Sequence, residues 1–193
     1  MKNDCYFAIN KNDEIRDSST SGGVFYSVAE YVLSKGGVCY AARFDKKFNV
    51  VHSSFDKIED IKPFKGSKYV SSYLGDTYNQ IKANLDSDRW VLFVGAPCQV
   101  NGLLNFLKKP YDNLVTMDFI CHSNAPANIW RNYLDSYFDV ESINNICFKD
   151  KSNGWKNFQF RIDFKDGTHY IENGRTNLYM AGYLNGTYML PSC

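Results

Sequence analysis

Hydrophobic positions follow helical spacing in some segments of the chain and strand-like spacing in others. Apolar residues at positions 24, 25, 28, 29, 32 and 33 recur with the helical period, which predicts a helix over 24–33. Residues 90–95 form an almost continuous apolar run, typical of a strand buried on both faces of a parallel sheet. Similar patterns predict helices over 78–85, 100–107 and 127–138 and strands over 38–44, 50–55 and within 113–121. The alternation predicts an α/β domain with a mostly parallel sheet flanked by helices.

The pattern changes after residue 143. Residues 158–164 alternate between apolar and polar positions, and a Lys165-Asp166-Gly167 turn precedes 169–172. This arrangement predicts an antiparallel hairpin added to the α/β body toward the C-terminus. Residues 177–190 show no clear period, and we expect a short helix there. A length of 193 residues predicts one domain over 1–193. Residues 10–17 are polar and predict a turn.

Composition excludes several classes of protein. The chain is 44% hydrophobic and 22% charged, which excludes disorder, and its net charge of +1 favours no nucleic-acid partner. No apolar run reaches the roughly 20 residues of a membrane span. The first residues show no apolar signal-peptide core, so we expect a cytoplasmic protein. In that compartment its six cysteines are not expected to form disulfides, and we predict that Cys5, Cys39 and Cys147 are buried and inert.

Two loops have the composition of anion sites. The loop 18–23 is rich in Ser, Thr and Gly and opens a predicted helix, so its backbone N–H groups and the helix dipole could bind a phosphate. The alternative is a helix capped by Thr20 or Ser21. In the loop 66–70, Lys68 could supply a charge and Tyr69 a ring face, although a plain surface turn would have the same composition.

Cysteines follow two predicted strands. Cys98 lies in Gly95-Ala96-Pro97-Cys98-Gln99, after the strongest strand and at the start of a helix, where the pKa of a thiol falls. The Ala96–Pro97 bond could be cis. Cys121 follows the next strand, so both thiols would share the carboxyl edge where α/β sheets bind ligands. The adjacent His122 could titrate near neutral pH. A buried cysteine and a structural histidine are the plainer alternatives.

Together these segments resemble one known family. Seven short motifs occur in order along nearly the whole chain: Ser19-Thr20-Ser21-Gly22-Gly23-Val24-Phe25, Gly36-Gly37-Val38-Cys39-Tyr40-Ala41-Ala42, Gly66-Ser67-Lys68-Tyr69-Val70, Gly95-Ala96-Pro97-Cys98-Gln99-Val100, Asp118-Phe119-Ile120-Cys121-His122, Gly154-Trp155 and Pro191-Ser192-Cys193. The ordered set resembles the coenzyme F420 hydrogenase/dehydrogenase beta-subunit family, in particular its bacterial members.

The resemblance implies an α/β flavoprotein that binds FAD and a 4Fe–4S cluster. Electrons would pass between a ferredoxin-like partner protein or domain and a small-molecule acceptor, such as a deazaflavin. The residues that would contact the flavin are Ser19, Thr20, Ser21, Gly22, Gly23, Ser67, Lys68, Tyr69, Pro97 and Gln99. The cluster ligands would be Cys98, Cys121 and Cys193.

The chain departs from the family pattern in four places. A fourth cluster cysteine would lie three residues beyond Cys193, and an N-terminal ferredoxin-like segment with clustered cysteines is absent. Ser123 stands where Gly is usual, and Leu190 where Arg is usual. The first two departures lead us to expect a domain cut from a longer oxidoreductase.

Two other functions compete with the redox function. Cys98 could be the nucleophile of a thiol-dependent transferase or hydrolase, with His122 as its base. The domain could also be a non-catalytic interaction module of an electron-transfer complex. We favour the redox function because three cysteines and two Gly/Ser loops share one predicted sheet edge, as a cofactor site requires.

Overall fold

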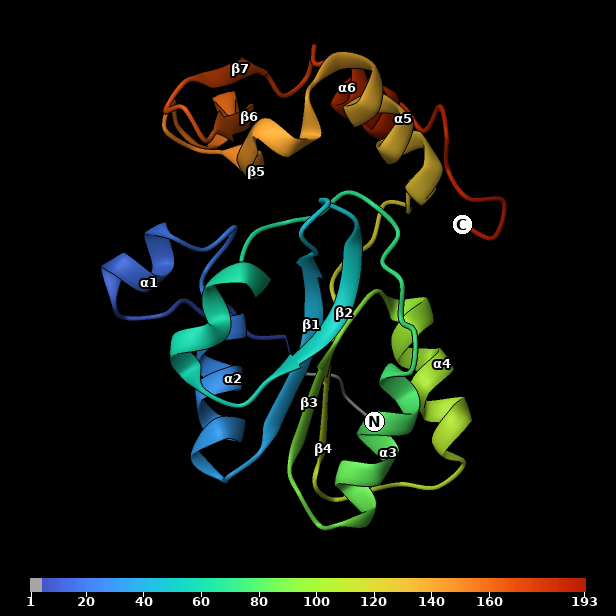
Figure 1. Cartoon of the computed structure of the whole chain (residues 1–193). Coiled ribbons are helices and arrows are strands. Elements are labelled where there is room, and N and C mark those ends of the chain that lie inside the picture. The colour runs from blue at the N-terminus through green and yellow to red at the C-terminus, as the bar shows by residue number, and fades with distance from the viewer. Residues whose placement is uncertain (1–4) are drawn as a thin grey trace.

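The computed structural model describes residues 5–193, which form two lobes (Figure 1). The helices are α1 Asp13–Asp17, α2 Val24–Ser34, α3 Thr77–Asp86, α4 Pro97–Leu107, α5 Ala127–Tyr137 and α6 Leu178–Leu184. The strands are β1 Val38–Phe44, β2 Val50–Phe55, β3 Val91–Val94, β4 Leu114–Met117, β5 Ile143–Asp150, β6 Gln159–Phe164 and β7 His169–Asn173. Three short 3-10 helices are η1 Ile58–Phe64, η2 Val140–Ser142 and η3 Trp155–Asn157.

The first lobe is the predicted α/β body. Its sheet has the order β2-β1-β3-β4, in which β1, β3 and β4 are parallel and β2 runs antiparallel to β1. Successive residues of β3 point to opposite faces: Leu92 packs in the core with α2 and η1, and Phe93 in the core with α3 and α4. The helices therefore cover both faces (Figure 1), and the predicted fold class is confirmed.

The second lobe contains a three-stranded antiparallel sheet in the order β5-β6-β7, with α5 and α6 packed beside it. The predicted hairpin is β6-β7. Strand β5 was not predicted, because its pairing with β6 shifts register between Ile143 and Asn145 and again between Cys147 and Asp150. Those irregularities break the period of two on which the prediction of strands depends.

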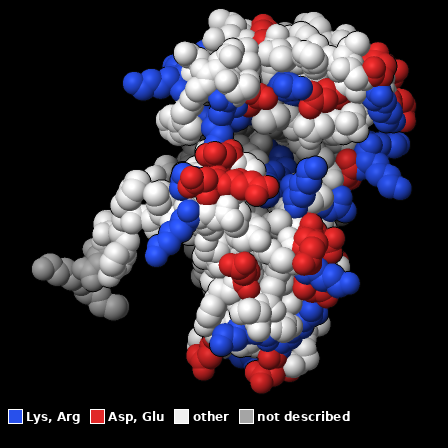
Figure 2. Space-filling model, turned by 90° about the vertical axis from the view of Figure 1, so that its left-hand side faces the viewer, with Lys and Arg blue, Asp and Glu red and all other residues white. Residues whose placement is uncertain are grey.

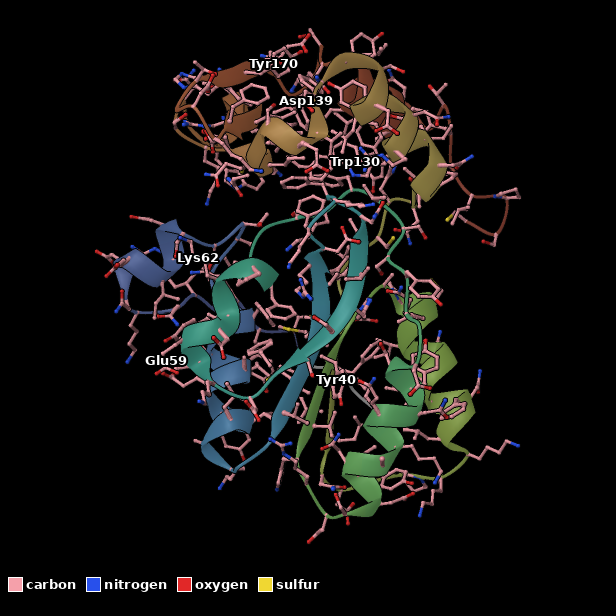
Figure 3. The ribbon with its side chains drawn as sticks, viewed as in Figure 1. Tyr40, Glu59, Lys62, Trp130, Asp139 and Tyr170 are labelled. Atoms are coloured by element: carbon pink, nitrogen blue, oxygen red, sulfur yellow. The ribbon has the colours of Figure 1, made fainter. Side chains whose placement is uncertain are left out.

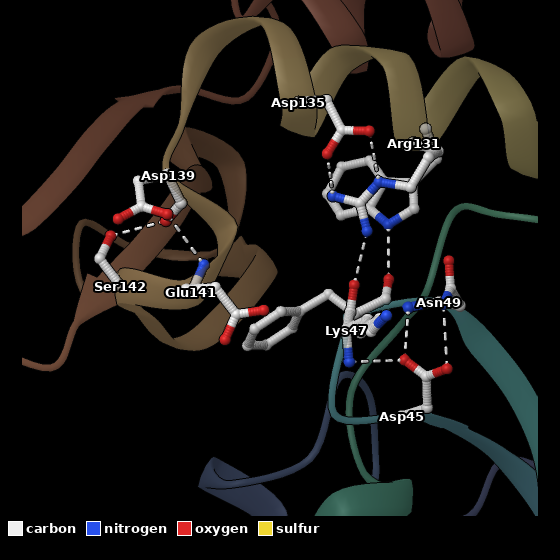
Figure 4. Close-up of polar contacts among 10 residues, drawn as sticks. Asp45, Lys47, Asn49, Arg131, Asp135, Asp139, Glu141 and Ser142 are labelled. Atoms are coloured by element: carbon white, nitrogen blue, oxygen red, sulfur yellow. Dashed lines mark hydrogen bonds and ion pairs between the residues drawn. The ribbon is translucent and has the colours of Figure 1, made fainter.

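Helix α5 joins the two lobes through a tight turn of the first lobe, as Figure 4 shows. Trp130 Nε1 donates to the Phe48 carbonyl at 2.8 Å, and Arg131 Nη1 donates to the Lys47 carbonyl at 2.7 Å. Trp130 also belongs to an apolar core that includes Val50 of the first lobe. The apolar core thus continues from one lobe into the other.

Several local predictions were wrong. Residues 10–17 contain the short helix α1, whose Asn12 N-cap side chain accepts from Ile15 N–H. Neither Thr20 nor Ser21 caps α2, whose N-cap is Gly23 with φ of 79°. The Ala96–Pro97 bond is trans, since residues 5–193 contain no cis peptide.

Every helix that the structure describes is too short or too polar to span a lipid bilayer.

Candidate functional site

The structure brings the two predicted anion loops together. Ser67 Oγ lies 3.5 Å from Thr20 Oγ1, and Lys65 Nζ donates to Ser18 Oγ at 2.5 Å. The loop 18–23 packs on the loop after η1 because η1 lies beside α2 in one core. Hydroxyl groups and an ammonium group are therefore concentrated at the start of α2.

A third segment reaches the same place from the second lobe. Lys151 Nζ donates to the Ser19 carbonyl, and Trp155 Nε1 donates to the Thr20 carbonyl at 3.5 Å. Lys149 Nζ lies 4.6 Å from the centre of the Trp155 ring. Lysines of both lobes thus surround the loop. Figure 2 shows basic side chains bordering the hollow between the lobes on the face that carries α1, with acidic side chains nearby.

No side chain within residues 5–193 caps the N-terminus of α2. Gly23 lies in the left-handed region with φ of 79°, where a side chain would be strained, and it carries no side-chain oxygen that could accept from the first-turn N–H groups. The helix is 11 residues long, so its dipole places positive partial charge at this end. With Lys65 and Lys151 beside it, this N-terminus provides the electrostatics of a phosphate site.

Lys68 holds its own loop together. Its Nζ donates to the carbonyls of Pro63, Lys65 and Gly66 at 3.1, 2.8 and 3.2 Å, which uses all three ammonium hydrogens. Burial lowers the pKa of Lys68 to about 7, and the charge of a Cys147 thiolate acts in the opposite direction. Lys68 therefore shapes the loop that presents Ser67 and Tyr69.

Aromatic rings connect this loop to the cysteine-containing segment. The Tyr69 and Tyr183 ring centres are 4.8 Å apart, and those of Tyr183 and His122 are 5.8 Å apart. Tyr183 donates its hydroxyl to the Ser123 carbonyl at 2.8 Å. Tyr183 therefore connects His122, the neighbour of Cys121, to Tyr69 in the loop 66–70.

Cys98 and Cys121 both follow strands that end at the carboxyl edge of the first sheet. Strands β3 and β4 are parallel neighbours, as the predicted shared edge requires, although β4 ends at Met117, four residues before Cys121. Burial raises the pKa of Cys121, and charges on Cys193 and Cys98 act in the same direction. Among residues 5–193, however, no group of three His, Cys, Asp or Glu side chains is arranged to hold a metal ion.

Pro97 and Gln99 organise the turn that carries Cys98. Pro97 is the first residue of α4. Gln99 Oε1 accepts from Ala96 N–H at 3.0 Å, and Gln99 Nε2 donates to Ser72 Oγ at 2.9 Å. Both residues therefore stabilise the start of α4, and their side chains do not project away from it.

The other cysteines differ in environment. Cys39 is buried, as predicted. Cys5 is exposed, which contradicts its predicted burial, because the N-terminal segment lies outside the core. Cys147 is half-buried on β5, so its predicted full burial was also wrong.

We expect the thiols to differ in reactivity. At pH 8, iodoacetamide should label the exposed Cys98 and Cys193 first, Cys121 more slowly because its pKa is raised, and Cys39 not at all, because burial raises its pKa to about 12. Peptide mass spectrometry over time measures the order. Labelling of Cys39 in the folded protein at the rate of Cys98 would contradict this structure.

Sequence reasoning missed several residues of the site and of its surroundings. Lys65, Lys149 and Lys151 carried no signal, because single lysines in turns are usually solvated. Trp155 stood in the Gly154-Trp155 motif and could have been found there. His52, on β2, is buried. Its Nε2 lies 3.0 Å from the Val94 carbonyl, and its Nδ1 has no hydrogen-bond partner among residues 5–193.

Comparisons with known proteins agree on one group. The family model for the C-terminal region of the coenzyme F420 hydrogenase/dehydrogenase beta subunit matches residues 88–193. A chain in a solved structure titled for the xenon-derivatised F420-reducing [NiFe] hydrogenase complex of Methanosarcina barkeri is similar, with a TM-score of 0.62 and 16% identity. The similarity covers 96% of this chain and 62% of that one. No curated protein sequence matches.

Proposed function

Because this chain belongs to the coenzyme F420 hydrogenase/dehydrogenase beta-subunit family, we propose that it is an electron-transfer domain that binds FAD between its lobes. One observation carries the proposal: a lysine from each lobe, Lys65 and Lys151, donates to the loop that leads into the N-terminus of α2. A dinucleotide pyrophosphate is the anion that such a site suits.

The residues present fit FAD. Main-chain N–H groups at the start of α2, together with Lys65 and Lys151, would bind the pyrophosphate. Tyr69 and Trp155 offer aromatic faces beside the loop for a flat ring. FAD, when bound, supplies transfer of a hydride or of single electrons, and this chain's residues would bind and orient it.

The cluster site is incomplete in this chain. A 4Fe–4S cluster is ordinarily held by four thiolates, of which Cys98, Cys121 and Cys193 would supply three. The described residues do not by themselves fit the cluster, so no step of electron transfer is assigned to it. We propose the three thiols as one side of a centre completed from another segment or subunit. That subunit would be the redox partner, and a small molecule would be the other reactant.

Anaerobic titration with FAD tests the function. Bound flavin should give absorption bands near roughly 370 and 450 nm that stay with the protein through gel filtration. Dithionite should then bleach the bound flavin. Folded protein that binds no FAD would contradict the proposal, and Cys98-dependent turnover of an acyl or alkyl substrate would then favour a thiol enzyme. The structure gives Cys98 and His122 no hydrogen bond to one another within residues 5–193.

A further inference from the structure

The second lobe has a small aromatic cup on its far side from the first lobe. Figure 3 shows Tyr170 at that side, whereas Trp130 lies toward the first lobe. The cup has a volume of about 340 Å³, within the range of small-ligand pockets. It is lined by Tyr133, Tyr137, Phe138, Tyr170, Glu172 and Leu178.

Four aromatic rings from two elements form the wall. The centres of Tyr133 and Tyr137 are 5.3 Å apart, those of Tyr133 and Phe138 are 5.8 Å apart, and those of Phe138 and Tyr170 are 5.1 Å apart. Phe138 follows α5 directly, and Tyr170 lies on β7. Tyr137 and Leu178 are each 60% exposed, so the cup is open to solvent.

A carboxylate is fixed among these rings. Glu172 Oε2 accepts from the Tyr170 hydroxyl and from Asn177 Nδ2, the latter at 2.8 Å. Asn177 is fully buried, donates also to Tyr133 Oη at 2.9 Å, and caps α6 through Met180 N–H. The position of the carboxylate is therefore set before any ligand arrives.

In the part of the chain that the structure describes, no cation pairs with this carboxylate. Among residues 5–193, no Lys, Arg or His nitrogen lies within 4.0 Å of Glu172. The cation–π contacts within the same part of the chain all involve other rings. Aromatic faces and an anion attract the same kind of ligand, an organic cation.

We propose that this cup binds a methylated ammonium group, either of a free small molecule or of a methylated lysine side chain. The methyl groups would contact the rings of Tyr137, Phe138 and Tyr170, and Glu172 would supply the charge. A primary ammonium fits less well, because its three N–H groups need three acceptors and, among the described residues, Glu172 is the one carboxylate in the lining. This inference is independent of the proposed flavin site.

Titration of the full chain with choline, followed by calorimetry and by NMR shifts of the aromatic protons, tests the proposal. Choline should bind at least about tenfold more tightly than 3,3-dimethylbutan-1-ol, its neutral isostere. A parallel titration with Nα-acetyl-Nε-trimethyllysine amide distinguishes the sources: tighter binding of that probe indicates a protein ligand, and tighter binding of choline a small molecule. Equal affinity for choline and the neutral alcohol, or no binding of either cation, would overturn the proposal.

Substitutions distinguish a loss of choline binding at the cup from a loss of the folded structure. Glu172→Gln keeps an acceptor oxygen for Tyr170 and Asn177 but removes the charge, and should weaken choline binding about tenfold. Glu141→Gln, at an exposed carboxylate outside the cup, should leave binding unchanged. Tyr137→Ala should weaken binding and Tyr137→Phe should preserve it. Because Tyr137 is largely exposed, both variants should keep the wild-type melting temperature, and unchanged choline affinity in Tyr137→Ala and Glu172→Gln would contradict the assignment.

Discussion

Replacement of Trp130 by alanine is expected to lower the free energy of unfolding by about 3–5 kcal/mol, the usual cost of truncating a buried aromatic residue. Trp130 is 1% exposed. Its ring centre lies 4.9 Å from that of Phe148 and 4.8 Å from that of Tyr179. Alanine would leave a large cavity where the lobes meet and would remove the hydrogen bond to the Phe48 carbonyl.

Urea denaturation followed by circular dichroism measures the effect. Trp130→Phe keeps most of the ring volume but loses the Nε1 donor, and should cost about 1–3 kcal/mol because the part-buried Phe48 carbonyl loses its partner. The matched control is Trp155→Ala. Trp155 is 61% exposed, so its loss should change stability by about 0.5 kcal/mol or less. A cost for Trp130→Ala as small as that of the control would show that the lobes do not share this core.

The sequence predicts the first lobe well because its signals are local. Residues 90–95 carry a continuous apolar run, and the helix 24–33 carries the 3.6-residue period, so each element can be recognised within its own segment. The parallel pairing of β3 with β4 fits the single helix, α4, that connects them. The added hairpin was recognised from the turn at Lys165-Asp166-Gly167.

The candidate site is less predictable because it depends on contacts distant in sequence. Lys151 reaches the Ser19 carbonyl across 132 positions, and Trp155 reaches Thr20 across 135. No local pattern encodes such pairs. Lys68 is a different case. The sequence shows that the residue is charged, but it does not show that the ammonium group donates to three nearby carbonyls.

Removal of two lysines should separate recognition of phosphate from recognition of the flavin ring. In Lys65→Met combined with Lys151→Met, FAD should bind at least about a hundredfold more weakly than in the wild type, since each charge-assisted hydrogen bond to phosphate contributes about 1.5–3 kcal/mol. Fluorescence quenching of FAD measures the dissociation constant. The dependence of that constant on salt should also decrease in the double variant, because fewer charges meet the pyrophosphate.

Riboflavin is the control ligand, because it has the ring system of FAD and no phosphate. If Lys65 and Lys151 act on the pyrophosphate, the double variant should bind riboflavin as the wild type does, and only the affinity for FAD should fall. Lys46→Met combined with Lys47→Met removes the same net charge from an exposed turn and should leave both affinities unchanged. An equal loss for FAD and riboflavin would mean that the substitutions distort the loop 18–23. Unchanged FAD affinity would place the pyrophosphate away from α2, because the two ammonium groups nearest its N-terminal loop donate to Ser18 and Ser19.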